Sequence, residues 1–472
     1  MKNSLKYDTK QIIRSILFVL FSIIIIISLF YTKTLGLIFV YLIFLINLYN
    51  KNNKYELPIL FVFIISTNVL EFGSLEQLPY IQLGPGIRFN LLDLIVITFI
   101  IFLWNKIINI KTPSSWLINY NFLLTILFII IGFIIYKTPR EAGTNYGRVL
   151  IYITFYYVFY LYFTDINRIK RLLFLISIIV LLGTSIQLIE YFLNYRFELP
   201  GVVPFSSFYS EKGERIFTAG FERIYLWTRV TIFIFVMTAF GMAFYTINKS
   251  TYYLLISLVS IVGFLLALSR IWFLGISLIL FVILLTSPKE GKFRIILASI
   301  LLIVFLNLLQ MYSIDLLGFD LFAAITGRLK SASTLGRYYG EMDTFTIRVL
   351  MFNENLKGFL SSPLFGLGFG STIWNKYYNV DLGVINRLVL TGLIGTLPII
   401  LFIIGYILRL IKFINKKIDN ERKAILVAIL AILIGHFPMY IWQIDFWGSN
   451  YIFVIVMLLA MGDRIITNFE VK

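Results

Sequence analysis

Runs of apolar residues long enough to cross a membrane recur along most of this 472-residue chain. A helix of about 20 apolar residues crosses a hydrocarbon core about 30 Å thick. The candidate runs are residues 12–30, 35–50, 57–70, 90–105, 118–136, 149–163, 172–193, 224–247, 251–268, 271–286, 294–312, 384–411, 424–441 and 446–462. They predict an all-α, polytopic integral membrane protein with about 12–14 transmembrane helices. We expect one membrane domain over residues 1–472.

Composition excludes several other classes of protein. Hydrophobic residues make up 59% of the chain and charged residues 14%, whereas about a quarter of a soluble protein is charged. The absence of cysteine excludes disulfides, iron–sulfur clusters and thiolate zinc sites, and one histidine, His436, cannot form an imidazole metal site. We therefore expect no metal and no cofactor. For His436, beside Pro438, both helix packing and a role in a site stay open.

Basic segments between the runs predict the orientation of the chain. Residues 51–54, 167–171, 287–294 and 412–423 are rich in Lys and Arg, as cytoplasmic loops are. The N-terminus has the positive flank of a signal peptide but no small-residue cleavage site, which predicts an uncleaved first helix. This orientation makes residues 194–223 a first large extracytoplasmic loop. Residues 313–383 then form the main one, which contains an amphipathic helix.

Arginine, rather than lysine, dominates the segments predicted to lie outside. The planar guanidinium group suits bidentate recognition of phosphate, so this face is expected to hold an anion. Arg229, Arg270 and Arg387 each lie within about a turn of apolar sequence, where a charge costs free energy unless it faces a cavity or a partner. The alternative for each is an arginine that extends to lipid headgroups. The candidate residues are Arg140, Arg148, Arg215, Arg223, Arg229, Arg270, Arg337, Arg348 and Arg387.

Residues 348–371, RVLMFNENLKGFLSSPLFGLGFGS, form an unusual stretch of the main loop. Phe345, Val349, Phe352, Leu356 and Phe359 recur at helical spacing, with Arg348 and Asn355 at the edge of this stripe, which predicts a helix lying flat in the outer interface. Pro363 ends it. Three glycines at alternate positions then favour a turn with close backbone approach. A nucleotide-binding loop is not expected, because GK[ST] is missing and no strand precedes the glycines.

Several of these motifs resemble the O-antigen polymerase and O-antigen ligase superfamily of bacterial envelope proteins. The similar stretches, within roughly residues 215–410, are TAGFERIYLWTRVTIF, LSRIWFLGISL, and the arginine-bearing helix leading to PLFGLGFG and later GLIG. Where such ligases carry His-Asn before GLIG, this chain has Asp381. That residue is either a helix N-cap or a general base that accepts a proton from a sugar hydroxyl. The difference favours a polymerase.

The resemblance implies a metal-independent glycosyltransferase in the bacterial inner membrane, with its active site facing the periplasm or exterior. Its substrate would be an undecaprenyl-diphosphate-linked oligosaccharide, with Arg270, Arg348 and Asp381 catalytic and the other arginines binding substrate. Expected partners are membrane lipids and a chain-length regulator protein, with no nucleic acid. Two alternatives stay open: an O-antigen ligase that transfers the glycan to lipid A or another acceptor, and a lipid-glycan flippase or transporter.

Overall fold

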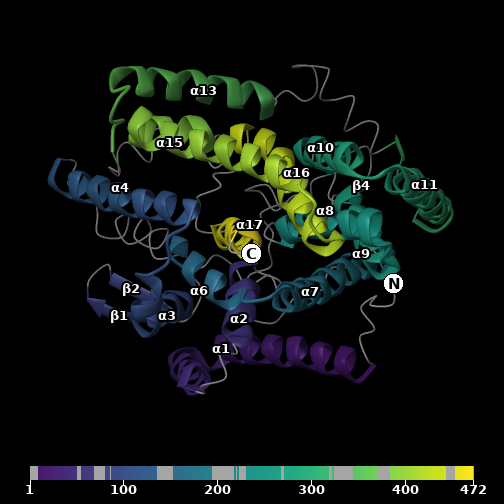
Figure 1. Cartoon of the computed structure of the whole chain (residues 1–472), viewed down its shortest axis with the longest axis horizontal. Coiled ribbons are helices and arrows are strands. Elements are labelled where there is room, and N and C mark those ends of the chain that lie inside the picture. Colours follow the sequence, from purple (N-terminus) through teal and green to yellow (C-terminus); the bar gives the residue numbers. More distant parts are fainter. Residues whose placement is uncertain are drawn as a thin grey trace.

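The computed structural model describes residues 9–49, 55–67, 80–84, 87–135, 152–193, 217–218, 221–222, 230–266, 270–317, 322–323, 344–368, 383–442 and 452–470. These residues are almost entirely helical (Figure 1). The helices are α1 (Thr9–Tyr49), α2 (Glu56–Thr67), α3 (Leu91–Ile107), α4 (Pro113–Ile135), α6 (Phe155–Tyr162), α7 (Ile166–Leu193), α8 (Val230–Asn248), α9 (Thr251–Leu266), α10 (Arg270–Thr286), α11 (Lys289–Leu317), α13 (Thr344–Ser361), α15 (Gly383–Ile414), α16 (Asn420–Trp442) and α17 (Ile452–Glu470).

Two short antiparallel pairs of strands join this bundle. β1 (Tyr80–Gly84) pairs with β2 (Ile87–Asn90), and β3 (Phe217–Thr218) pairs with β4 (Phe221–Glu222). β2 leads directly into α3 through a capping box, in which the side chain of Asn90 accepts from the Asp93 backbone N–H and the Asp93 carboxylate accepts from the Asn90 backbone N–H. The reciprocal bonds satisfy two N–H groups that the first helical turn leaves unpaired.

Each apolar run predicted from the sequence overlaps a helix, which confirms the all-α fold class. One difference is informative. The first two predicted runs fall within one helical element, α1, whose 41 residues exceed what one span needs and which Figure 1 shows as two stretches running in different directions. The residues between those runs, Tyr31–Thr34, contain no proline or glycine that would end a helix.

Three helices of the described residues are long and apolar enough to cross a membrane by length and composition. They are α7 over Ile166–Ile186, α11 over Lys289–Leu308 and α15 over Gly383–Ile414. Shorter apolar helices cover Ile12–Ile25, Phe233–Asn248, Thr251–Leu265 and Trp272–Thr286. Together they support a helical protein embedded in a membrane, and the total number of spans stays a prediction.

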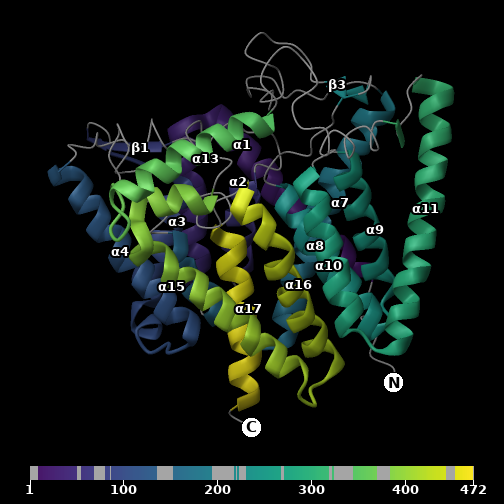
Figure 2. The same cartoon turned by 90° about the horizontal axis from the view of Figure 1, so that it is seen from above.

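The helices differ in how much of their apolar surface is buried. In α16, every side chain from Ala424 to Ile432 is buried, and α8 packs against α9 and α16. α11 lies at the edge of the molecule (Figure 2) and exposes most of its apolar side chains, including Phe293 and Leu308. Soluble proteins rarely expose continuous apolar surface of this kind, whereas lipid requires it.

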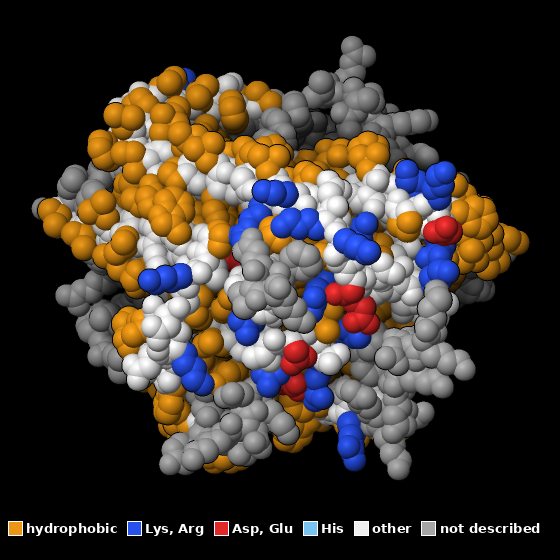
Figure 3. All heavy atoms as spheres, in the orientation of Figure 1, with side chains coloured by type: hydrophobic (Ala, Val, Ile, Leu, Met, Phe, Trp, Pro, Cys, Tyr) orange, Lys and Arg blue, Asp and Glu red, His pale blue; other side chains and the backbone are white. Residues whose placement is uncertain are grey.

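The two ends of the bundle differ in their charge and in the elements they carry. Figure 2 shows α13, β1 and β3 at one end and the α10–α11 turn, the α15–α16 turn and the end of α17 at the other. The second end carries exposed lysines, among them Lys289, Lys292, Lys416 and Lys417. We refer to the first of these ends as the α13 end and to the second as the basic end. In the orientation of Figure 1, Lys and Arg side chains gather near the middle of the visible face, with apolar side chains around them (Figure 3).

Candidate functional site

Helix α15 is broken near the α13 end. Gly392 has φ 61° and ψ −163° inside it, so the chain continues as two helical segments of different length. The shorter segment, residues 383–391, carries Asn386 and Arg387. A break in a membrane-spanning helix leaves backbone N–H and C=O groups without partners, and these need others inside the protein. The partners in this chain come from a distant part of the sequence.

The loop that follows α13 fills the break. The N–H groups of Leu367 and Gly368 donate to the carbonyls of Val389 and Leu390, over 2.7 and 3.0 Å. In return, the N–H groups of Leu393 and Ile394 donate to the carbonyls of Pro363 and Leu364, over 2.9 and 3.1 Å. Residues 362–368 thus cap the end of one segment and the start of the next. We call this arrangement, residues 362–368 against residues 389–394, the glycine clasp.

Two glycines let the backbones in the clasp approach each other. A Cβ atom on Gly366 would lie 2.6 Å from the backbone nitrogens of Thr391 and Gly392, closer than real contacts allow. A Cβ on Gly392 would overlap the carbonyl of Leu364. Both residues also have positive φ, 70° and 61°, which disfavours other residue types. Of the three glycines predicted to form a turn, Gly366 and Gly368 have positive φ, and Gly366 approaches the backbone of α15; Gly370 lies outside the described residues.

α13 packs along the short segment of α15 through a polar contact (Figure 1). The Nδ2 of Asn355 donates to the Oδ1 of Asn386 over 2.8 Å, and both side chains are 2% exposed. Phe352, from the apolar stripe predicted in the sequence, is 38% exposed, so the buried face centres on the polar edge of that stripe. A buried amide pair of this kind fixes one register between two helices, because any shift would leave its polar groups unpaired.

α4 supports α15 on either side of the break. One guanidinium nitrogen of Arg387, Nη2, donates to the Oδ1 of Asn121 over 2.8 Å, and Asn121 is anchored by its own Nδ2 to the carbonyl of Leu117. The hydroxyl of Tyr120 donates to the carbonyl of Ile394 over 2.6 Å. That carbonyl cannot receive its usual helical partner, because the residue four positions on is Pro398, which has no N–H.

The structure describes three of the predicted site residues in part. Arg387 lies on α15 as described above. Arg270 is the first residue of α10, and Arg348 lies on α13, but their side chains fall outside the described part of the structure. The others lie outside the described residues altogether, namely Asp381, Arg140, Arg148, Arg215, Arg223, Arg229 and Arg337. The prediction that these guanidinium groups lie together on one face of the protein is therefore not tested by the described residues.

His436 lies deep between helices. Its side chain is 1% exposed, and its ring lies 5.9 Å from that of Phe235 on α8. Beside it, Gly435 of α16 and Gly275 of α10 are so close that a Cβ on either would meet the other's carbonyl oxygen. This environment agrees with the packing role. Among the described residues, no group of three or more His, Cys, Asp or Glu side chains could hold a metal ion.

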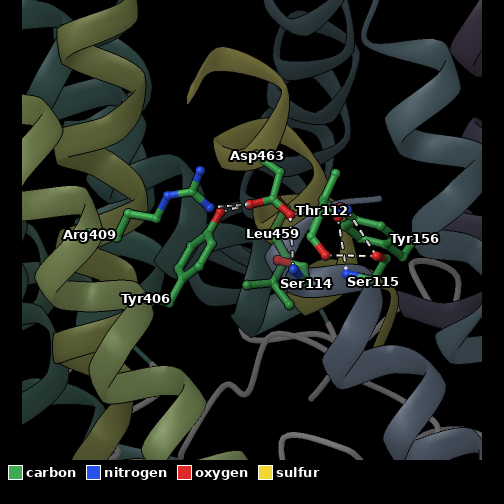
Figure 4. A network of polar contacts seen from close by, with 8 residues as sticks. All are labelled: Thr112, Ser114, Ser115, Tyr156, Tyr406, Arg409, Leu459 and Asp463. Atoms are coloured by element: carbon green, nitrogen blue, oxygen red, sulfur yellow. Dashed lines mark hydrogen bonds and ion pairs between the residues drawn. The ribbon is translucent and has the colours of Figure 1, made fainter. Parts of the chain in front are cut away.

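A second polar cluster, which the sequence analysis missed, is shown in Figure 4 and lies in the half of α17 that ends at the basic end in Figure 2. Its centre is Asp463 of α17, which is fully buried. Asp463 Oδ2 accepts from the hydroxyl of Tyr156 over 2.7 Å and from the backbone N–H of Ser114 over 3.3 Å. Its Oδ1 faces Arg409 of α15, whose Nη1 is 3.9 Å away. We call these residues, with Tyr406 and Thr112, the Asp463 cluster.

Neighbouring groups complete this cluster. The Tyr156 hydroxyl also contacts the Thr112 hydroxyl over 2.6 Å, and the Tyr406 hydroxyl donates to the carbonyl of Leu459 over 3.1 Å. Gly462 leaves room for Tyr406, since a Cβ there would overlap the tyrosine oxygen. Ionisable groups inside a membrane protein are rare and usually functional or paired. The signal in the sequence was Asp463, which directly follows the apolar run 446–462, and Arg409, which lies within the apolar run 384–411.

Neither a protein-family model nor a curated protein matches this sequence. The residues of the chain and its motifs therefore provide the basis for a functional proposal. Two features stand out for that purpose: the glycine clasp with Arg387 near the α13 end, and the Asp463 cluster toward the basic end.

Proposed function

We propose that this chain polymerises polyprenyl-diphosphate-linked oligosaccharide repeat units at the outer face of a bacterial cytoplasmic membrane, as do the O-antigen polymerases it resembles. The observation that carries the proposal is the glycine clasp. Two motifs of the resemblance, PLFGLGFG and GLIG, are separate in the sequence, yet two backbone hydrogen bonds of the clasp join them directly and two more join PLFGLGFG to Val389 and Leu390, just before GLIG. The helix segment it holds bears Arg387, a residue suited to a diphosphate.

The reaction needs a stabilised leaving group rather than a metal or a nucleotide. A hydroxyl of the acceptor repeat unit attacks the anomeric carbon of the donor glycan, and the bond from that carbon to the diphosphate breaks. The departing polyprenyl diphosphate gains negative charge, which arginines stabilise strongly where water is scarce. In this proposal Arg270, Arg348 and Arg387 contact the diphosphate, and Arg140, Arg148, Arg215, Arg223, Arg229 and Arg337 line the path of the substrate.

Asp381 is the proposed base that takes the proton of the acceptor hydroxyl. It lies two residues before the start of α15 at Gly383, so an N-cap role is the competing explanation. Asp381→Asn separates the two, because asparagine caps about as well as aspartate but cannot take the proton. A catalytic role predicts a fall in polymer of at least about 100-fold at matched protein level. Asp381→His is expected to recover part of the activity, whereas full polymer from Asp381→Asn would remove this residue from the catalytic set.

The glycan profile of a deletion strain tests the function as a whole. Loss of a polymerase leaves single repeat units attached to their acceptor, and the complementing gene restores the ladder of longer chains. Loss of a ligase instead leaves long polymer that is attached to nothing. The proposal predicts the first pattern. Unattached long polymer in the deletion strain would assign the chain to the ligase alternative.

Two observations favour a lipid-glycan transporter as a second candidate. Secondary transporters contain broken helices near the membrane midplane, and α15 is broken at Gly392. They also use buried ionisable pairs, and Arg409 faces the fully buried Asp463. A transporter predicts that the deletion strain accumulates lipid-linked repeat units on the cytoplasmic side and displays none outside. Externally displayed single repeats would contradict it and agree with the polymerase.

A further inference from the structure

An apolar cavity lies between the glycine clasp and the Asp463 cluster. It has a volume of about 100 Å³ and is lined by side chains of α4, α15, α16 and α17. All of the lining side chains are aliphatic or aromatic, and the one hydroxyl among them, that of Tyr406, is hydrogen-bonded to the carbonyl of Leu459. Cavities without polar partners do not hold water well but do admit hydrocarbon. The chemistry of the lining thus selects a hydrocarbon occupant.

One face of α4 connects this cavity with Arg387. Ser114, Leu117 and Asn121 follow one another at helical spacing, so they lie in a row along the helix. The backbone N–H of Ser114 contacts Asp463, the side chain of Leu117 lines the cavity, and the side chain of Asn121 accepts from Arg387. Four residues of helix span about 6 Å. The asparagine that Arg387 contacts is therefore about one helical turn along α4 from Leu117, which lines one edge of the cavity.

The cavity communicates with the lipid-facing surface of the molecule. Two of its lining residues, Ile404 of α15 and Phe437 of α16, are 47% and 46% exposed. On the side of the basic end it is closed by Tyr406, part of the Asp463 cluster. A ligand that fits this arrangement has an anionic head at Arg387, a hydrocarbon segment in the cavity and a longer tail that continues into the bilayer.

We propose that the cavity holds the isoprenoid units nearest the diphosphate in the polyprenyl chain of the lipid-linked glycan. The inference rests on the proposed function, because a polyprenyl chain follows directly from the diphosphate that Arg387 would contact. A volume of about 100 Å³ exceeds the roughly 10–15 Å³ that one water needs and is below the roughly 150 Å³ that admits benzene, so it takes a short segment rather than a whole chain. The methyl branches of an isoprenoid would fill it more completely than a straight acyl chain.

Photo-crosslinking to a lipid tests this site without requiring turnover. A photoreactive phenylalanine analogue replaces Phe437 in the full-length chain. The labelled protein is then reconstituted in phosphatidylcholine vesicles that contain undecaprenyl phosphate. The control position is Leu401, which lies on α15, is 58% exposed and does not line the cavity. Adducts are identified by mass. We expect position 437 to capture undecaprenyl phosphate at least about tenfold more than position 401, a difference of about 1.4 kcal/mol in occupancy.

Phosphatidylglycerol replaces undecaprenyl phosphate in a second set of vesicles, which separates a polyprenyl site from a general anionic-lipid site. The proposal predicts equal capture of phosphatidylglycerol at the two positions. Preferential capture of phosphatidylglycerol at position 437 would overturn the choice of ligand. Equal capture of undecaprenyl phosphate at positions 437 and 401 would overturn the site.

A cavity-filling variant provides the matched mutation. Ile403→Trp places a large side chain into the lining, whereas Leu401→Trp adds the same bulk to exposed surface of the same helix. Ile403→Trp should reduce capture at position 437 to the level of position 401, and Leu401→Trp should not. If Ile403→Trp does not fold, the comparison of positions and lipids still decides the question. If the chain captures undecaprenyl phosphate specifically but restores no polymer when its gene is returned to a deletion strain, the polymerase is rejected and the lipid site is kept. If the gene restores polymer but the chain shows no specific capture, only the site is rejected.

Discussion

The two ends of α15 are held by contacts of opposite kinds. Near the α13 end, the support is neutral: backbone hydrogen bonds of the glycine clasp, the amide pair Asn355–Asn386 and the contact of Arg387 with Asn121. Toward the basic end, the support is ionic, with Arg409 facing the buried carboxylate of Asp463. α4 takes part in both, through Asn121 and Ser114. The difference indicates which end is arranged for a charged ligand.

The contact between Arg387 and Asn121 involves a neutral amide, whereas the contact of Arg409 involves a carboxylate. Asn121 orients Arg387 without a negative charge in that contact, so the contact itself does not compete electrostatically with a phosphate. Arg409 instead lies 3.9 Å from a carboxylate that already neutralises it. Under the proposed function, the Arg387 end would bind substrate and the Arg409 end would provide structural support. Mutations at the Arg387 end should therefore reduce the amount of polymer, whereas mutations at the Arg409 end should mainly reduce the stability of the protein.

The largest effect is expected from Gly392→Ala in the glycine clasp. The added methyl would overlap the Leu364 carbonyl at a residue with positive φ, which should cost more than about 3 kcal/mol and prevent formation of the clasp. The control is Gly405→Ala on the same helix, where no atom lies within 4 Å of the new methyl and the change should be neutral or stabilising by up to about 1 kcal/mol. Yield of monodisperse protein in detergent is the measurement. Wild-type yield and polymer from Gly392→Ala would show that the clasp is not required.

The next effect separates the two arginines of α15. Arg387→Lys keeps the charge but loses the planar fork, so we expect polymer to fall about 100-fold with unchanged protein level. Arg409→Lys should change polymer by less than about twofold, since a point charge serves an ion pair at 3.9 Å nearly as well. Polymer length in the complemented deletion strain measures both. Equal losses from the two variants would contradict the division between the ends.

A smaller effect is expected on stability from Asp463→Asn. Asparagine keeps an acceptor for Tyr156 but removes the partner of Arg409, and because the Arg409 side chain is 23% exposed, water limits the cost to about 1–3 kcal/mol. The control is Glu354→Gln, which breaks the exposed pair with Lys357 and should leave the unfolding temperature nearly unchanged. Thermal unfolding in detergent compares them. A large loss of polymer per folded molecule in Asp463→Asn would instead favour the transporter.

The smallest effect concerns the proline of α15. Tyr120→Phe removes the hydroxyl that satisfies the Ile394 carbonyl, at a cost of about 1–2 kcal/mol. Pro398→Ala returns a backbone N–H four residues after Ile394, so the double variant Tyr120→Phe/Pro398→Ala should be more stable than Tyr120→Phe alone. Thermal unfolding of both single variants and the double variant completes the cycle. Additive effects would show that the hydroxyl and the proline are not coupled.

The sequence predicted the positions of the helices well but did not predict the break in α15 at Gly392. Apolar runs report composition over about 20 residues, so they marked 384–411 as one span and could not register the unusual backbone at Gly392. The turn at Gly366 was predicted, but its partner lies on another element, and pairing of distant backbones has no local signal. The role of Asn355 was likewise hidden, because an amphipathic pattern places an asparagine on the polar side by default.

Reconstitution with a defined substrate tests the central claim most directly. The purified full-length chain is placed in lipid vesicles with one undecaprenyl-diphosphate-linked repeat unit as the only glycan, and the products are separated by size. The proposal predicts a ladder whose rungs differ by one repeat unit, with one undecaprenyl diphosphate released for each bond formed. It also predicts that the ladder is lost in Arg387→Lys and kept in Arg409→Lys. Folded, monodisperse protein that forms no product longer than one repeat unit would contradict the assignment.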